Sequence, residues 1–95
     1  MQTVILSGVV TENCEKRTDK NGHEYVRFRL ACEDPDLSGK KTTTIYRCYT
    51  YNLLFDNLKK DDLLFLSGSL VINKYRDSIN LDVKVQNITK GFKQS

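Results

Sequence analysis

Two stretches of this chain alternate polar and apolar side chains with the period of a β-strand, which restricts the fold to one built on half-buried strands. The first stretch covers residues 24–32, and its apolar face consists of Val26, Phe28, Leu30 and Cys32. The second covers residues 42–51, where one face carries Tyr46, Cys48 and Thr50. We therefore predict two strands with Cys32 and Cys48 as small core residues.

Three further apolar segments extend this pattern along the chain. Residues 4–10 and 63–75 are predicted strands that are interrupted by Gly8 and Gly68, and mid-strand glycines are typical of the bends that close a small barrel. Residues 79–85 form the last predicted strand. Asn21-Gly22 indicates a hairpin turn within the polar segment 13–23, and residues 33–41 are expected to be a loop.

A short helix is expected between the third and fourth of these five strands. Asn52 can cap a helix over residues 53–60, with Leu54 and Leu58 four residues apart on its buried face. The fold class is therefore all-β, a five-stranded Greek-key barrel called the OB-fold. An SH3-like barrel is the competing architecture, and the helix counts against it. We expect one OB-fold domain over residues 1–90 and a short polar tail over 91–95.

Composition argues against an enzyme or a metal protein. The three cysteines form no CxxC pair and His23 is the single histidine, so a zinc site has too few clustered ligands. The Asp61-Asp62 pair has no catalytic partner nearby, and we expect no cofactor. There is no membrane-spanning apolar run and no signal peptide, so we predict a cytoplasmic protein with reduced thiols. The net charge of +3 permits a polyanionic partner without requiring one.

The outward face of the two alternating strands combines aromatic rings with cations. Single-stranded nucleic acid is bound by this combination, because bases stack on aromatic rings while phosphates pair with cations. Two alternatives stay open: Arg47 could instead form a cross-strand ion pair, and exposed tyrosines could serve a subunit interface. The face is made of Tyr25, Arg27 and Arg29 from the first stretch and Ile45, Arg47, Tyr49 and Tyr51 from the second.

Four short motifs, in this order, resemble the bacterial single-stranded-DNA-binding proteins over about residues 3 to 88. The resemblance implies an OB-fold and non-catalytic, largely sequence-independent binding of single-stranded DNA, in replication, recombination or repair. The motifs are Met1-Gln2-Thr3-Val4-Ile5-Leu6-Ser7-Gly8, Phe28-Arg29-Leu30-Ala31, Ile45-Tyr46-Arg47-Cys48 followed by Tyr51, and Leu66-Ser67-Gly68-Ser69-Leu70.

The resemblance also implies which residues stack on bases. Tyr51, near the end of the third strand, and Tyr75, at the close of the fourth, match stacking positions of the family. Two other stacking positions fall at Ile45, which is aliphatic, and near Asp36, whose carboxylate would repel phosphate. Affinity is therefore expected to be weaker than in the family, or to be carried by Tyr25, Tyr49, Arg27 and Arg29. The family's basic positions match Arg47, Lys60 and Lys74.

Two departures from the family pattern concern the end of the chain. The turn at Arg76 to Ser78 is shorter than in the family, and the acidic tip that recruits replication enzymes is absent, with a basic segment over residues 90–95 instead. The sequence is therefore either truncated or that of a specialised relative, and primosomal replication protein B is an OB-fold relative that also lacks the tip. The alternative function is accordingly a protein-interaction module of a replication assembly that binds nucleic acid weakly.

The expected partners are single-stranded DNA or RNA, replication proteins and further copies of the chain, but no membrane. The resemblance implies that the first strand pairs with its copy in a second subunit, and that dimers pair again into tetramers. We therefore expect a homo-oligomer, either a dimer or a tetramer.

Overall fold

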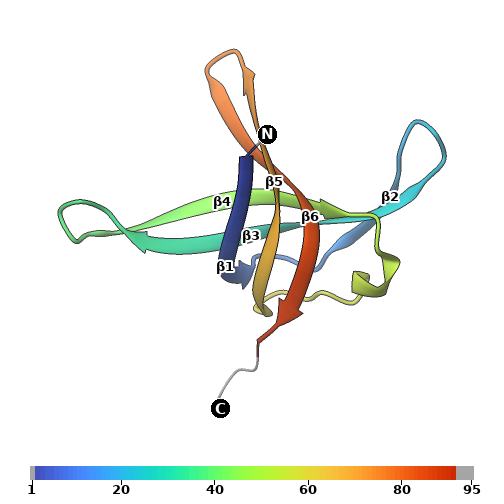
Figure 1. Cartoon of the computed structure of the whole chain (residues 1–95), viewed down its shortest axis with the longest axis horizontal. Helices are drawn as coiled ribbons and strands as arrows, with labels where there is room; N and C mark the ends of the chain where they lie inside the picture. The colour runs from blue at the N-terminus through green and yellow to red at the C-terminus, as the bar shows by residue number, and fades with distance from the viewer. Residues whose placement is uncertain (1, 92–95) are drawn as a thin grey trace.

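The computed structural model describes residues 2–91 and is built from strands around one closed barrel (Figure 1). Hydrogen bonds join the strands in the order β1-β5-β6-β4-β3-β2, and a further pairing of β1 with β3 closes the ring. Five of the strands therefore form the barrel, as predicted for the all-β OB-fold, and β2 extends the sheet from β3. The strands are β1 (Gln2–Val10), β2 (Glu15–Thr18), β3 (Glu24–Pro35), β4 (Lys41–Thr50), β5 (Leu63–Tyr75) and β6 (Ser78–Lys90).

Close backbone approaches at two glycines shape this barrel. Strands β1 and β3 pair at Val9 with Ala31 and at Val10 with Leu30. A Cβ atom on Gly8 would lie only 3.0 Å from the Ala31 carbonyl carbon and nearer still to its oxygen. Gly68 in β5 sits equally close to the Lys84 carbonyl of β6, where the register shifts by a bulge. Both predicted bends are therefore places where one strand crosses close over another.

The barrel interior holds the apolar faces that the alternation predicts. Val26, Phe28, Leu30 and Cys32 of β3 are all buried, and Cys48 of β4 is buried with them. Burial raises the pKa of the Cys48 thiol to about 12, so this group stays protonated and packs as a small apolar side chain. The rest of the core is contributed by the other barrel strands and the β4–β5 connection: Val10, Leu58, Leu64, Leu66, Val83 and Val85.

Three hairpins reach beyond the barrel as arms: β2–β3, β3–β4 and β5–β6 (Figure 1). The predicted loop over residues 33–41 was wrong in extent, because β3 and β4 remain paired out to Pro35 and Lys41. Only the turn at residues 36–40 is irregular. Asp36 holds it together, since its Oδ1 accepts hydrogen bonds from the backbone N–H of Ser38 at 2.9 Å and of Lys40 at 3.0 Å.

The predicted helix over residues 53–60 is wrong in extent. Asn52 caps a single 3₁₀ turn, η1 (Leu53–Phe55), by accepting a hydrogen bond from Leu54 N–H at 3.1 Å. Leu58 is buried, but Leu54 is 83% exposed and does not belong to a buried face.

The backbone that would have continued this helix bonds to β1 and its extension instead. Val10 carbonyl accepts from Asp61 N–H at 2.8 Å, Val10 N–H donates to Asp62 carbonyl at 2.9 Å, and Cys14 N–H donates to Leu58 carbonyl at 3.0 Å. The bond to Leu58 carbonyl replaces an i to i−4 bond of the predicted helix, and the bonds at Asp61 and Asp62 hold the chain that follows it against β1.

The polar segment 13–23 also contains a strand that alternation did not indicate. β2 is exposed along its length and pairs with β3 from Glu15 opposite Arg27 to Thr18 opposite Glu24. The hairpin turn predicted at Asn21-Gly22 is present, with Gly22 at φ +83°. At the other end of the chain, β6 stops at Lys90. Residues 92–95 of the predicted tail lie outside the described part of the chain, so the domain boundary stays a prediction.

Candidate nucleic-acid interface

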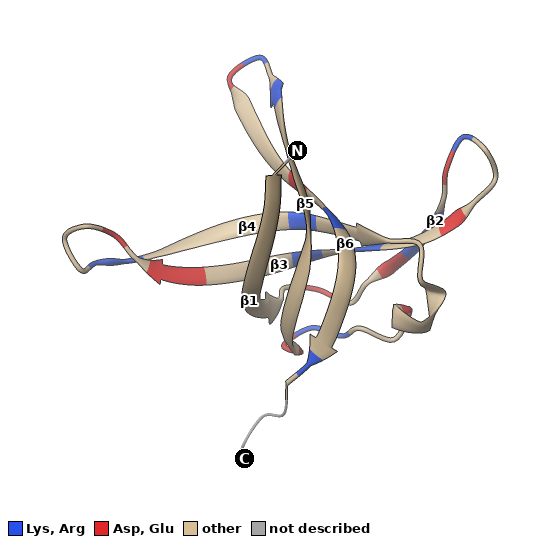
Figure 2. Ribbon diagram, in the orientation of Figure 1, with Lys and Arg blue, Asp and Glu red and all other residues tan. Residues whose placement is uncertain are grey.

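The register of β3 and β4 brings the predicted aromatic and basic residues onto one outward surface. Arg27 lies opposite Tyr49, and Arg29 lies opposite Arg47. Blue segments, which mark Lys and Arg, lie on the middle of β3 and β4, and red acidic segments lie toward the hairpin arms (Figure 2). The outward side chains predicted for the two alternating stretches therefore lie side by side, with cations next to aromatic rings.

Three tyrosines form one cluster at the end of this surface nearest β2. Tyr25 lies 5.6 Å from Tyr51 between ring centroids, and Tyr49 lies 6.3 Å from each of the other two. Both contacts of Tyr49 are edge-to-face, and the Tyr25–Tyr51 pair is tilted by 49°. Such separations are those of interacting aromatic pairs. The cluster leaves Tyr51 exposed and Tyr25 and Tyr49 half-buried.

Asp19, in the turn between β2 and β3, fixes the outermost ring. The Tyr51 hydroxyl donates to Asp19 Oδ2 at 3.1 Å, which raises the pKa of the tyrosine. The other oxygen of Asp19 accepts from the backbone N–H groups of Asn21 and His23, both at 2.9 Å. The bond from His23 is the largest cause of the lowered pKa of Asp19. This carboxylate therefore ties the turn of the β2–β3 arm to the tyrosine cluster.

The cluster borders an open hollow of about 490 Å³. Both basic and acidic side chains line the hollow, so it is not a uniformly positive groove. Its base includes Phe28 and Cys48, whose side chains otherwise belong to the core. The charged residues that line it are Arg27, Arg29 and Arg47 together with Glu12, Glu15, Asp19 and Asp82.

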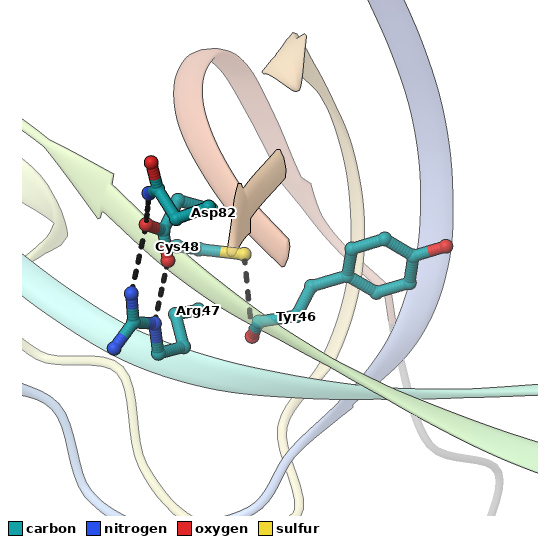
Figure 3. Close-up of polar contacts among 5 residues, drawn as sticks. Tyr46, Arg47, Cys48 and Asp82 are labelled. Carbon is teal, nitrogen blue, oxygen red and sulfur yellow. Dashed lines mark hydrogen bonds and ion pairs between the residues drawn. The ribbon is translucent and has the colours of Figure 1, made fainter. Parts of the chain in front are cut away.

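Two of these arginines already have carboxylate partners. Arg47 Nε donates to Asp82 Oδ1 at 2.5 Å and Nη2 donates to Asp82 Oδ2 at 2.8 Å, across the parallel pairing of β4 with β6 (Figure 3). This bond raises the pKa of Arg47 and lowers that of Asp82. Arg27 lies 3.3 Å from Glu15 of β2. Arg29 forms no ion pair with any other residue in the range 2–91.

The remaining predicted site residues do not line the hollow. Tyr75 and Lys74 are near the tip of the β5–β6 arm, where Tyr75 is exposed and the Arg76 guanidinium stands 5.5 Å from its ring centroid. Ile45 is exposed on β4 opposite Ala31, toward the β3–β4 arm. Lys60 is exposed in the connection before β5, and its N–H donates to Asn13 at 2.9 Å.

The ion pair of Arg47 was one of the alternatives left open by the sequence, and the structure shows it with Asp82. The rest of the acidic lining was missed. Glu15 and Asp19 belong to the polar segment 13–23, and they reach the hollow because β2 pairs with β3. In the last predicted strand, Asp82 alternates with the apolar residues 79, 81, 83 and 85, so the sequence indicates that its side chain points outward. The sequence does not indicate that β6 pairs in parallel with β4, and this pairing places Asp82 against Arg47.

Solved structures of low sequence identity share this fold. The small single-stranded DNA-binding protein of Streptomyces coelicolor superposes with a TM-score of 0.75 at 20% identity, covering 95% of this chain and 94% of that one. The single-strand binding protein of Plasmodium falciparum in complex with single-stranded DNA gives 0.74 at 17% identity, covering 97% and 96%. A deletion variant of the single-stranded DNA-binding protein from Thermus aquaticus gives 0.71 at 21% identity, covering 97% of this chain but 51% of that one.

Two searches give negative results. A search of curated proteins finds no match to this sequence. In the described part of the chain, no helix has the length and apolar character needed to cross a membrane.

The family is shown by a sequence model of known families. The model of the single-strand binding protein family matches residues 1–91, and the chain therefore belongs to this family.

Proposed function

We propose that this protein binds single-stranded DNA without catalysis and with little dependence on sequence. The observation that carries the proposal is the cluster of Tyr25, Tyr49 and Tyr51 beside the arginine-lined hollow. Bases of any sequence offer a ring face to stack on the tyrosines, and the neighbouring arginines would pair with phosphates of the strand. In a duplex these ring faces are stacked on one another, so duplex DNA should bind more weakly.

The other predicted contacts would extend the path of the strand beyond the hollow. Tyr75 and Lys74 would contact it from the β5–β6 arm, Ile45 from β4 and Lys60 from the connection before β5. Their separation from the tyrosine cluster means that each would add its own contact to the strand. We further propose that the protein serves DNA replication, recombination or repair in the cytoplasm, where its three unpaired cysteines would stay reduced.

We also propose that two copies pair through β1. One edge of this strand is paired with β5 from Gln2 to Val9, whereas the other edge pairs with β3 only at Val9 and Val10. Within the described residues, the backbone of positions 2–8 therefore presents one edge without a strand partner, and Ile5 on this strand is 85% exposed. A second β1 would cover both, giving a dimer that could pair again into a tetramer.

Sedimentation at micromolar concentration tests this assembly, and it should show more than one chain per particle. A monomeric particle that still binds oligo(dT) would refute the pairing. In a dimer, two tyrosine clusters would share one DNA strand and gain avidity.

One observation favours the alternative function of a protein-interaction module in a replication assembly. Because Arg27 and Arg47 already face carboxylates, the hollow is less basic than its arginine content indicates. Titration with oligo(dT), oligo(U) and a duplex, followed by tyrosine fluorescence, separates the two functions. Binding of oligo(dT) that weakens as salt rises supports DNA binding, whereas no binding at low salt supports the interaction module. The oligo(U) arm decides whether RNA is also bound.

A further inference from the structure

Arg29 and Arg47 lie directly opposite each other on β3 and β4 but are in different electrostatic states. Asp82 neutralises Arg47 through two hydrogen bonds, at 2.5 Å and 2.8 Å. The Asp82 side chain is only 18% exposed, compared with 49% for that of Arg47. The carboxylate is therefore the less exposed member of the pair, and both residues line the hollow.

The Asp82 carboxylate is itself held from a third strand segment. Asn73 of β5 donates its side-chain amide to Asp82 Oδ2, the oxygen that also accepts from Arg47 Nη2. Both oxygens of Asp82 are thus engaged, and the carboxylate has a defined orientation. A guanidinium bonded at two points to such a carboxylate is fixed in its plane as well as in its position.

The donors of Arg47 are only partly used by this pair. A guanidinium carries five N–H groups, and the bonds to Asp82 use two of them. Among residues 2–91 the other three N–H groups have no hydrogen-bond acceptor, and the side chain is 49% exposed. Guanidinium planes stack on bases, and the N–H groups donate to base edges or to phosphate oxygens. The group is therefore equipped to stack and donate, while its positive charge is already balanced.

We propose that Arg47, held flat by Asp82, extends the tyrosine stacking surface, whereas Arg29 supplies the phosphate-neutralising charge. This inference rests on the proposed binding of single-stranded DNA and assigns different roles to two neighbouring arginines. Asp82 acts as a positioning residue, because it reaches the DNA only through Arg47. The salt dependence of binding distinguishes the two roles, since it counts the phosphates that cations neutralise.

The experiment is a fluorescence titration with oligo(dT) at several salt concentrations, using the full chain, four test variants and one control variant. Arg29→Lys and Arg47→Lys keep the charge and remove the plane. Arg29→Ala removes a cation that forms no ion pair within residues 2–91. The double variant Arg47→Ala with Asp82→Ala removes a neutral pair, so it leaves the net charge unchanged. Lys90→Ala, which loses a cation placed 3.5 Å from Asp62 outside the hollow, is the control and should bind within about twofold of the parent.

The proposal predicts opposite patterns for the two arginines. Arg47→Lys and the double variant should each bind about tenfold more weakly with the salt slope of the parent. Arg29→Lys should stay close to the parent, and Arg29→Ala should flatten the slope by about 0.7.

Two results would overturn it. One is Arg47→Lys binding as tightly as the parent. The other is a double variant that flattens the slope as much as Arg29→Ala does, because Arg47 would then be a phosphate counter-ion. Thermal unfolding of each variant checks its fold. If the double variant does not fold, the affinity of Arg47→Lys alone tests the proposal. Failure of the parent to bind would instead refute the proposed function, and this inference with it.

Discussion

Replacing Gly68 by alanine should destabilise the barrel severely, because the added methyl group has no room. Its Cβ would stand 3.0 Å from both the Lys84 carbonyl carbon and Val83 Cγ1, and nearer still to the Lys84 oxygen. Ordinary contacts begin at 3.4 Å, so β5 and β6 would have to separate at the bulge. Backbone forms most of this contact, and side-chain rotation cannot relieve it.

The expected cost follows from these contacts. Overpacking of a tightly packed site costs about 1–3 kcal/mol, and the backbone clash places Gly68→Ala at the upper end. Separation of the strands would weaken neighbouring ladder hydrogen bonds worth about 1 kcal/mol each. A total of about 3–5 kcal/mol is a large part of the roughly 5–14 kcal/mol expected for a domain of this length. The urea midpoint should fall by at least about 1 M.

Urea unfolding followed by circular dichroism measures this effect, with Gly39→Ala as the matched control. Gly39 lies in the β3–β4 turn at φ +86°, and a Cβ atom added there would have no other atom within 4 Å, so alanine should cost only about 1 kcal/mol of backbone strain. Equal midpoints for the two variants would show that the close approach at Gly68 does not hold the barrel together. Because β6 carries Asp82 to Arg47, Gly68→Ala should also weaken oligo(dT) binding.

The remaining predictions concern the site and the acid sensitivity of the fold. Tyr51→Ala should weaken oligo(dT) binding by roughly 5- to 150-fold, whereas Tyr51→Phe keeps the ring and should bind like the parent; equal binding by all three would remove Tyr51 from the site. Tyr75→Ala should weaken binding on the same scale if the strand reaches the β5–β6 arm, and parent-like affinity would confine the site to the hollow. Hydrogen bonds, chiefly from the Ser38 side chain, lower the pKa of Asp36 in the folded state. The ionised carboxylate therefore stabilises the fold at pH values above the ordinary pKa of 3.8, and this stabilisation is lost as the pH falls below that value. Asp36→Asn should therefore lose less thermal stability than the parent between about pH 5 and about pH 2.5, and identical pH profiles would contradict this sign.

Alternation was sufficient to predict β3, β4 and the outward surface that they share. The inward set of residues 24–32 and the outward positions of Arg27, Arg29, Arg47 and Tyr49 follow directly from a side-chain period of two. A buried face specifies register strongly, because a slip by one residue would expose the whole apolar set. For this reason the alternation of polar and apolar residues identified the outward side chains as well as the buried ones.

The features that could not be predicted depend on contacts between distant segments. The helix over residues 53–60 has a suitable cap, but the Leu58 carbonyl in that segment accepts from the distant Cys14 N–H instead. β2 has no apolar face, since it is an exposed extension whose partner, β3, supplies the pairing. The Arg47–Asp82 pair joins residues 35 positions apart and depends on a parallel pairing that no local pattern encodes.

The central claim is that the tyrosine cluster and the arginine-lined hollow bind single-stranded DNA. The most direct measurement is a titration of tyrosine fluorescence with oligo(dT) and with a duplex of equal length, repeated at several salt concentrations. The account predicts quenching by oligo(dT) and weaker binding of the duplex. For each neutralised phosphate, the logarithm of the binding constant should fall by about 0.7 for every tenfold rise in salt concentration. No quenching and no binding of oligo(dT) at low salt would contradict it.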